Sequence, residues 1–413
     1  MRIRSLLTLG AVAATSLFGV LPARAADEEH RQMAEEMIDK AIAYLRTQQD
    51  EATGGWSIPE SGPNIPAITG LVINGMLLSD DIDGSDPTVA KALDYLYSFQ
   101  QDDGGIYDVI LANYNTAITV SALAQLENDP KARLIIDRAI PFLKRLQWSE
   151  DAIPGREDTA KVDRSHPYYG GVGYGGSGRP DNSNLNLMLE ALHDAGIDGE
   201  DPAFQRALVF LQRTQMLHKD ENGNLVNDMP YAEGSQQGGF IYATSPNKDN
   251  LGVGESKAGM MEETLSDGTV ASRLRSYGSI TYAGFKSYIY ANLKRDDPRV
   301  QAAYNWLREN YTLEENPSLG TNGYYYYLIT MSRALDAWGE DTIEVVIKSE
   351  AGDGSEEASP KTETRDWSND LIAKLAEMQN EDGSFRSVDD RWMENNPVLI
   401  TAYSLIALQH AID

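Results

Sequence analysis

A recurring pattern of apolar and polar positions runs along this chain. Six segments of nine residues each have an apolar face at helical spacing, with a leucine at the fifth position. The six segments are residues 41–49, 92–100, 139–147, 207–215, 303–311 and 371–379. An aromatic residue precedes the leucine in five of them, and glutamine closes five. The pattern predicts one helical unit that is used six times.

Each of these helices is followed by a glycine-rich turn and a second helical segment. Gly54-Gly55 precede the apolar residues 66–78, and Gly104-Gly105 precede residues 116–126. The predicted unit is therefore an α-hairpin. A hairpin of this kind cannot bury its apolar face alone, so stacked copies must share a core, and six of them can close into a ring. We expect an all-α domain over residues 26–413.

Two insertions interrupt the repeat. Residues 232–275 are rich in glycine and polar residues, which predicts a long surface loop. Residues 340–364 begin with a β-like alternation at Thr342 and then become polar, which predicts a short β-hairpin or a loop excursion.

The N-terminus predicts export. Arg2 and Arg4 precede an uncharged run, and Ala23-Arg24-Ala25 stands at the expected cleavage position, so residues 1–25 have the features of a signal peptide. We expect an exported protein, periplasmic or secreted, with no membrane-spanning segment in its mature part.

The amino-acid composition argues against several classes of site and partner. The chain has no cysteine, which excludes thiolate zinc sites and cysteine nucleophiles. Without the three arginines of the signal peptide, 32 basic residues face 63 acidic ones. Nucleic acid and anionic membrane surfaces are therefore poor partners for this chain.

The turns between paired helices resemble those of a known superfamily. The motif is a glutamine followed by a glycine and an aromatic residue, as in Gln49 with Gly55-Trp56 and in residues 379–385. It is similar to the repeat of protein prenyltransferase β-subunits and of squalene and oxidosqualene cyclases. The resemblance covers nearly the whole mature chain. It implies an (α/α)6 toroid of six α-hairpins whose central cavity is lined by the starts of the inner helices.

The chain departs from the catalytic motifs of that superfamily. Zinc-dependent members place an aspartate and a cysteine after a Gly-Arg-Pro turn, but here Ser183 follows Asp181. Cyclases carry an acidic Asp-x-Asp-Asp before Thr-Ala, and the counterpart here, residues 112–117, has Asn113 and Asn115 instead. Amides cannot deliver a strong acid proton. We expect no metal and no cofactor.

Several side chains remain candidates for a site. Asp181 is the candidate for an acidic group at the cavity mouth, although it also fits an N-cap. Arg179 is suited to an anionic group or to a loop carbonyl. Aromatic residues can contact an isoprenoid or a sugar through their π faces. The complete set of ligand-binding candidates is Arg179, Asp181, Tyr174, Tyr282, Asn115, Tyr326 and Trp392.

Three functions are compatible with this pattern. The missing catalytic groups favour a toroid that binds an apolar or isoprenoid-like ligand without catalysis. The first alternative is an enzyme with a relocated site, either a terpene cyclase-like or prenyltransferase-like catalyst or a glycan-cleaving enzyme. The second alternative is a scaffold for protein interactions.

Overall fold

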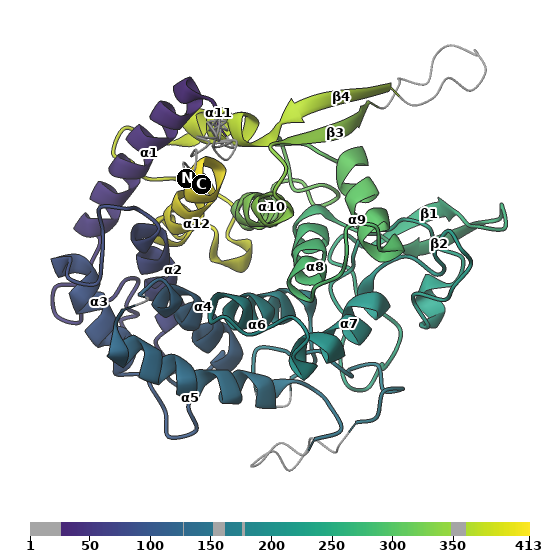
Figure 1. The fold of residues 1–413 in the computed structure, drawn as a ribbon, viewed down its shortest axis with the longest axis horizontal. Helices are drawn as coiled ribbons and strands as arrows, with labels where there is room; N and C mark the ends of the chain where they lie inside the picture. Colours follow the sequence, from purple (N-terminus) through teal and green to yellow (C-terminus); the bar gives the residue numbers. More distant parts are fainter. Residues whose placement is uncertain (1–25, 127, 152–161, 176–177, 348–360) are drawn as a thin grey trace, which may run out of the picture.

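The computed structural model describes residues 26–413 apart from residue 127 and the segments 152–161, 176–177 and 348–360. The predicted signal peptide lies outside the described residues. Among the described residues there are twelve α-helices and two small sheets, and the odd-numbered helices surround the even-numbered ones (Figure 1). The outer helices are α1 (Glu28–Thr47), α3 (Pro87–Tyr97), α5 (Pro130–Leu146), α7 (Pro202–Thr214), α9 (Pro298–Glu309) and α11 (Trp367–Met378). The inner helices are α2 (Pro66–Leu77), α4 (Ala112–Ala124), α6 (Asn182–Asp194), α8 (Gly278–Tyr290), α10 (Tyr324–Trp338) and α12 (Pro397–Ile412).

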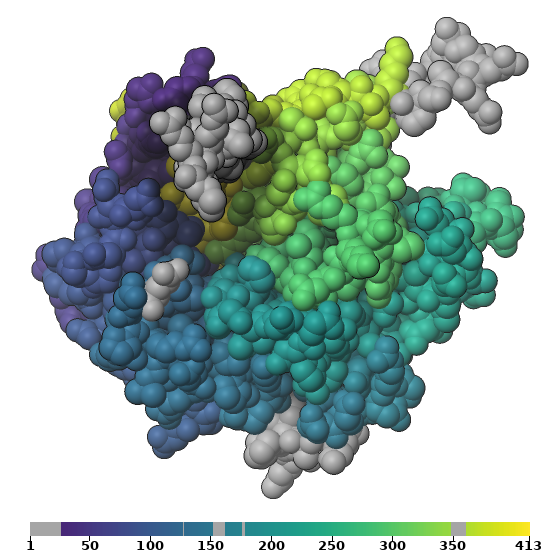
Figure 2. Space-filling view, viewed as in Figure 1, coloured from purple at the N-terminus to yellow at the C-terminus, as the bar shows by residue number. Residues whose placement is uncertain are grey.

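The inner helices make a closed circuit of contacts. Each packs against the next inner helix in the chain, and α12 returns to pack against α2. The first outer helix, α1, also packs against α11 and α12, so the first described helix lies beside the last two (Figure 2). The helical class that the repeat predicted is confirmed. Because the inner helices are covered by outer helices and by one another, they are buried almost all round.

The glutamine that closes the outer helix joins successive units. The side-chain amide of Gln147 donates to the carbonyl of Gly170 in its own turn and to the carbonyl of Ala203 in the next outer helix, both at 2.8 Å. The equivalent pair of bonds occurs at Gln49, Gln215 and Gln379. The Gln379 amide donates to the carbonyl of Met37 in α1 and thereby joins the last unit to the first.

The glycines of these turns are required by close backbone contact. Gly170 has a φ of +82°, and a Cβ atom there would lie 1.9 Å from the carbonyl oxygen of Arg206. Gly383 has a φ of +84°, and its Cβ would lie 2.2 Å from the carbonyl oxygen of Lys40. Only glycine tolerates both the conformation and the contact.

Four of the six outer helices begin at a capping aspartate that proline follows in the sequence, namely α3, α5, α7 and α9. Asp86, Asp201 and Asp297 each accept a hydrogen bond from a backbone N–H in the first turn of their helix. Asp129 does the same for α5. Proline at the first helical position has no N–H to leave unpaired, so this start is favourable.

Two antiparallel hairpins occupy the insertions. Strands β3 (Thr342–Ile347) and β4 (Lys361–Asp366) pair where the alternation at Thr342 predicted a hairpin. Strands β1 (Met260–Thr264) and β2 (Val270–Leu274) pair within the insertion that was expected to be a loop. The Asp267-Gly268 turn is a hairpin signal that this expectation overlooked. Glu263 anchors the hairpin, because its buried carboxylate accepts from the backbone N–H of Gln236 at 2.6 Å.

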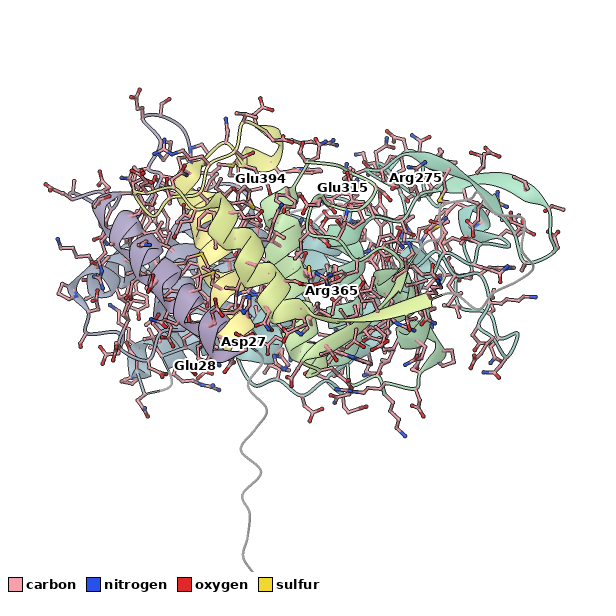
Figure 3. The ribbon with its side chains drawn as sticks, turned by 90° about the horizontal axis from the view of Figure 1, so that it is seen from above. Asp27, Glu28, Arg275, Glu315, Arg365 and Glu394 are labelled. Atoms are coloured by element: carbon pink, nitrogen blue, oxygen red, sulfur yellow. The ribbon has the colours of Figure 1, made fainter. Side chains whose placement is uncertain are left out.

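The loops that precede the inner helices lie on one face of the molecule. Figure 3 shows Arg275, Glu315 and Glu394, which come from three of these loops, toward that face, with Asp27 and Glu28 toward the other. None of the described helices is both long and apolar enough to cross a membrane.

Candidate functional site

A cavity of about 310 Å³ opens where the inner helices begin. Every inner helix contributes at least one lining side chain from its first two turns. The lining residues from the helices are Ile68, Tyr114, Ser183, Leu187, Ser279, Ile280, Tyr326, Leu399 and Tyr403. The loops that precede the helices contribute Ile65, Leu111, Tyr174, Tyr242, Tyr277, Trp392, Met393 and Glu394. The closed circuit of helices therefore brings residues from six units to one cavity.

The wall of the cavity is apolar and rich in phenol rings. Six tyrosines line it, and pairs of them approach one another, with ring centroids 6.4 Å apart for Tyr114 and Tyr174 and 6.3 Å apart for Tyr326 and Tyr403. Aromatic faces attract apolar surface and positive charge. The wall is therefore suited to an apolar ligand or to a carbocation.

Glu394 is the one carboxyl group among the lining residues. It follows the short 3-10 helix η2 (Arg391–Met393) and is only 1% exposed. Its Oε1 accepts a hydrogen bond from the backbone N–H of Tyr326 at 2.9 Å and so caps α10, whose N-cap position is a glycine. Its Oε2 has no hydrogen-bond partner within the described part of the chain. Burial raises the pKa of Glu394 to about 7, against the lowering effect of the N–H groups at the start of α10.

Replacement of Glu394 by glutamine should change the pH dependence of stability. A pKa of about 7 in the folded state, against an ordinary 4.5, means that the unfolded chain loses this proton first as the pH rises. The wild type should therefore lose stability between pH 4.5 and 7, by up to about 3 kcal/mol. Glutamine keeps the oxygen that accepts from Tyr326 but cannot ionise. The variant and the wild type should unfold alike at pH 4.5, and the variant should be more stable at pH 8.

Urea titrations across that pH range would measure the difference. Glu381→Gln, in an exposed turn nearby, controls for the change in net charge. A difference between the Glu394 variant and the wild type that is the same at every pH would contradict the prediction.

The loop that carries Glu394 covers part of the cavity mouth. Trp392 and Met393 both adopt positive φ, at 58° and 67°, and each is a little over 40% exposed while lining the cavity. Trp392 packs against Gly323, where a Cβ atom would lie 2.9 Å from the indole ring. The guanidinium of Arg391 stacks on the indole ring of Trp392, 4.3 Å from the ring centroid. These contacts hold an aromatic side chain at the mouth.

The structure brings three of the seven candidate residues to the cavity wall, namely Tyr174, Tyr326 and Trp392. In the run of four tyrosines at residues 324–327, Tyr326 is the one that lines the cavity. Tyr282 is buried against Tyr327, with ring centroids 5.8 Å apart, and does not line the cavity.

The other three candidates make contacts within the protein and lie outside the cavity wall. The side chain of Asn115 accepts from the N–H of Ala67 and donates to the carbonyl of Ile110. The guanidinium of Arg179 pairs with Glu255 at 2.6 Å and donates to the carbonyl of Pro246. Asp181, which was expected to line the mouth, is instead turned toward the start of α6.

Asp181 is the N-cap of α6. Its Oδ1 accepts from the N–H of Asn184 at 2.9 Å and from the hydroxyl of Ser183 at 2.7 Å. Burial raises the pKa of Asp181 in spite of these bonds. A carboxylate that is bonded in this way stabilises the start of the helix. It has little capacity left to accept hydrogen bonds from a ligand.

Asp181→Ala is expected to lower the free energy of unfolding by about 1–2 kcal/mol, because the helix start loses its cap. Asp181→Asn, which keeps an acceptor oxygen, should cost less. Denaturant melts of both variants, with Asp297→Ala as a reference for a cap on an outer helix, test this. An alanine variant of unchanged stability and altered ligand binding would assign the residue to a ligand instead.

Sequence reasoning missed Glu394 and a group of buried charges beneath the cavity. Glu190, Lys286 and Arg333 lie in inner helices and are 3%, 0% and 9% exposed. The available signal was Lys286, which is the single charged residue of α8. Within the described residues, no group of three or more His, Asp or Glu side chains is placed to hold a metal ion.

Comparison with known proteins gives distant structural likenesses. The chain matches no protein-family model and no curated protein sequence. A solved protein from Actinoplanes is similar over 92% of this chain and 100% of its own, with 15% identity and a TM-score of 0.46. The type II terpene cyclase MstE from Scytonema is similar over 92% of this chain and 98% of its own, with 13% identity and a TM-score of 0.31. Its R337A variant, solved in complex with geranylgeranyl dihydroxybenzoate, has 11% identity and a TM-score of 0.33.

Proposed function

We propose that this chain is an exported (α/α)6 toroid, similar in architecture to terpenoid cyclases, which binds an apolar, isoprenoid-like ligand in its tyrosine-lined cavity. The closed circuit of inner helices supports the architecture. The signal-like pattern of residues 1–25 supports export.

The composition of the cavity wall is the observation that supports an apolar ligand. All six inner helices converge on the cavity, and most of their lining side chains are aliphatic or phenolic. A volume of about 310 Å³ is at the lower end of the range for small-molecule sites. Apolar burial favours a hydrocarbon body, and the electron-rich faces of the phenol rings favour positive charge on the ligand.

Ligand-induced stabilisation would test this function. Protein purified without added lipid would first be extracted and analysed for bound isoprenoids. Unbound protein would then be melted with polyprenols and hopanoids. A ligand at 100 times its Kd should stabilise the protein by about 2.7 kcal/mol. Leu399→Trp, which fills the cavity from α12, should abolish the effect, whereas Leu134→Trp on the exposed side of α5 should not. Absence of any bound lipid and of any thermal shift would refute the apolar ligand.

A second candidate function, cyclase-like proton transfer, is favoured by Glu394. A protonated Glu394 in the cavity could give its proton to a ligand, and the tyrosine faces could stabilise the cation that forms. An acid of pKa about 7 is too weak for an unactivated alkene, so only a more basic group such as an epoxide would be protonated. Turnover of an epoxide that is lost in Glu394→Gln, with binding retained, would establish catalysis.

The glycan-cleaving alternative has less support. Glycosidases use two carboxyl groups that face each other across the substrate. Among the described lining residues, Glu394 has no second carboxyl group opposite it.

A further inference from the structure

A buried ionic cluster joins three neighbouring inner helices beneath the cavity. The carboxylate of Glu190 on α6 accepts from the ammonium of Lys286 on α8 at 2.5 Å, and its other oxygen pairs with the guanidinium of Arg333 on α10. All three side chains are at least nine-tenths buried. Two cations therefore share one carboxylate in a region of low dielectric.

A small chamber of about 30 Å³ lies beside this cluster and next to the main cavity. Its lining includes Asn186, Glu190, Lys286 and Arg333. Four residues line both the chamber and the cavity, namely Tyr114, Leu187, Tyr326 and Tyr403. The chamber is thus the deep end of the same site.

The polar groups of the chamber are incompletely paired. Among the described residues, the Nε–H of Arg333 and the hydroxyl of Tyr326 have no hydrogen-bond partner, and both groups can donate. Arg333 carries five N–H donors and Lys286 three, while Glu190 offers only two oxygens. Buried donors in native proteins are normally satisfied, so the chamber is built for an occupant that accepts hydrogen bonds.

The charges of the site differ between its two ends. Glu394 lies at the mouth, where the charge of Asp389 adds to the effect of burial in raising its pKa. On that side Arg179 is paired with Glu255, and the exposed Arg391 stacks on Trp392. A negative group is therefore attracted most strongly to the two buried cations at the deep end.

Other acids beyond the cluster do not face the chamber. Asp194 and Asp336 lie about one turn farther toward the ends of α6 and α10, and neither lines the chamber. Asp336 pairs with His410 of α12 at 2.7 Å. The excess of positive charge at the chamber therefore comes from Lys286 and Arg333.

We propose that the ligand of this site is an amphipathic carboxylic acid, whose hydrocarbon body fills the cavity and whose carboxylate enters the chamber to contact Arg333 and Lys286. This inference rests on the proposed function. The chamber sets the size of the headgroup: one water needs about 10–15 Å³ of such space, so about 30 Å³ holds two oxygen atoms but not a diphosphate.

Three ligands with one carbon skeleton test the headgroup. Geranic acid, geraniol and the hydrocarbon myrcene would be titrated into the full protein at pH 7.5 by calorimetry. Geranic acid should bind at least about tenfold more tightly than the other two, because its carboxylate meets a buried guanidinium. Equal affinity for the acid and the alcohol would overturn the headgroup site and leave the apolar cavity standing. Failure of all three to bind would overturn both.

A substitution in the chamber distinguishes binding of the ligand's carboxylate headgroup from binding of its hydrocarbon body. Arg333→Lys keeps the positive charge beside Glu190 but removes the unpaired Nε–H. The variant should reduce the preference for geranic acid severalfold or more. Its binding of myrcene should be unchanged, which would show that the cavity is intact. Arg299→Lys, an ion-paired arginine at the start of α9, is the control and should keep the preference. An Arg333→Lys protein that keeps the full preference for the acid would overturn the proposal.

Discussion

Replacement of Glu190 by glutamine is expected to lower the free energy of unfolding by about 3–5 kcal/mol. The carboxylate of Glu190 is the shared partner of Lys286 and Arg333, which are buried with it. Burial alone would raise the pKa of Glu190, but the charges of Arg333 and Lys286 outweigh it and lower the pKa. Removing the carboxylate leaves two cations in the interior without a counter-charge, which is the costly half of a buried ion pair.

The stability lost in the Glu190→Gln variant should depend on the charge of Lys286. Burial already lowers the pKa of Lys286, and Glu190 opposes that effect. Without Glu190, Lys286 should become neutral at a lower pH, and the variant should therefore be less destabilised at pH 9 than at pH 7. Denaturant melts at both values would show this.

Two further variants test whether unpaired buried charge is the cause of the destabilisation. Glu363→Gln removes half of an ion pair with Arg365 that is about half exposed, so the change should stay below about 1 kcal/mol. Replacing the whole cluster, as Glu190→Leu with Lys286→Met and Arg333→Met, should recover much of the stability because no unpaired charge remains. A Glu190→Gln protein as stable as the wild type would mean that the cluster is hydrated.

Leu211→Ala is expected to cost about 2–5 kcal/mol of unfolding free energy. Leu211 is 1% exposed on α7, and the equivalent leucines of the other five units are 0–1% exposed. Truncation removes the transfer free energy of the side chain and leaves a cavity between close-packed helices, which can collapse only in part.

Urea-induced unfolding of the variant tests this directly. Leu134→Ala, at an outer-helix position that is 63% exposed, is the matched control and should change stability by less than about 0.5 kcal/mol. A Leu211→Ala protein with unchanged stability would undermine the alignment of the six units, because that alignment places the six leucines in equivalent buried positions.

Part of the candidate site was predictable from sequence. The sequence resemblance implied a cavity at the starts of the inner helices, and Tyr174, Tyr326 and Trp392 do line one there. All three are aromatic residues, but Tyr282, which was proposed on the same ground, is buried against Tyr327 and does not line the cavity. Asp181 was ambiguous because the same residue type caps helices and binds ligands, and only its bonds to Ser183 and Asn184 distinguish the two roles.

The remaining site residues could not be found in this way. Glu394 is separated from Tyr326 by 68 residues, yet its carboxylate caps α10 because the loop before α12 folds over the neighbouring helix. The charges of Glu190, Lys286 and Arg333 meet across three helices, and their distances depend on how those helices are rotated. No local sequence pattern indicates how one helix is rotated relative to another.

The sequence by itself determined the units of this protein. Helical periodicity, the six leucines, the Asp-Pro starts and the glycine turns are local signals, because each depends on residues within a few positions along the chain. Only the tertiary structure decided how the units meet. It placed α12 against α2 and gathered six tyrosines and one carboxyl group into a single cavity. It also left two cations with one counter-charge beneath that cavity, since contacts between distant residues arise only when the whole circuit of helices is packed.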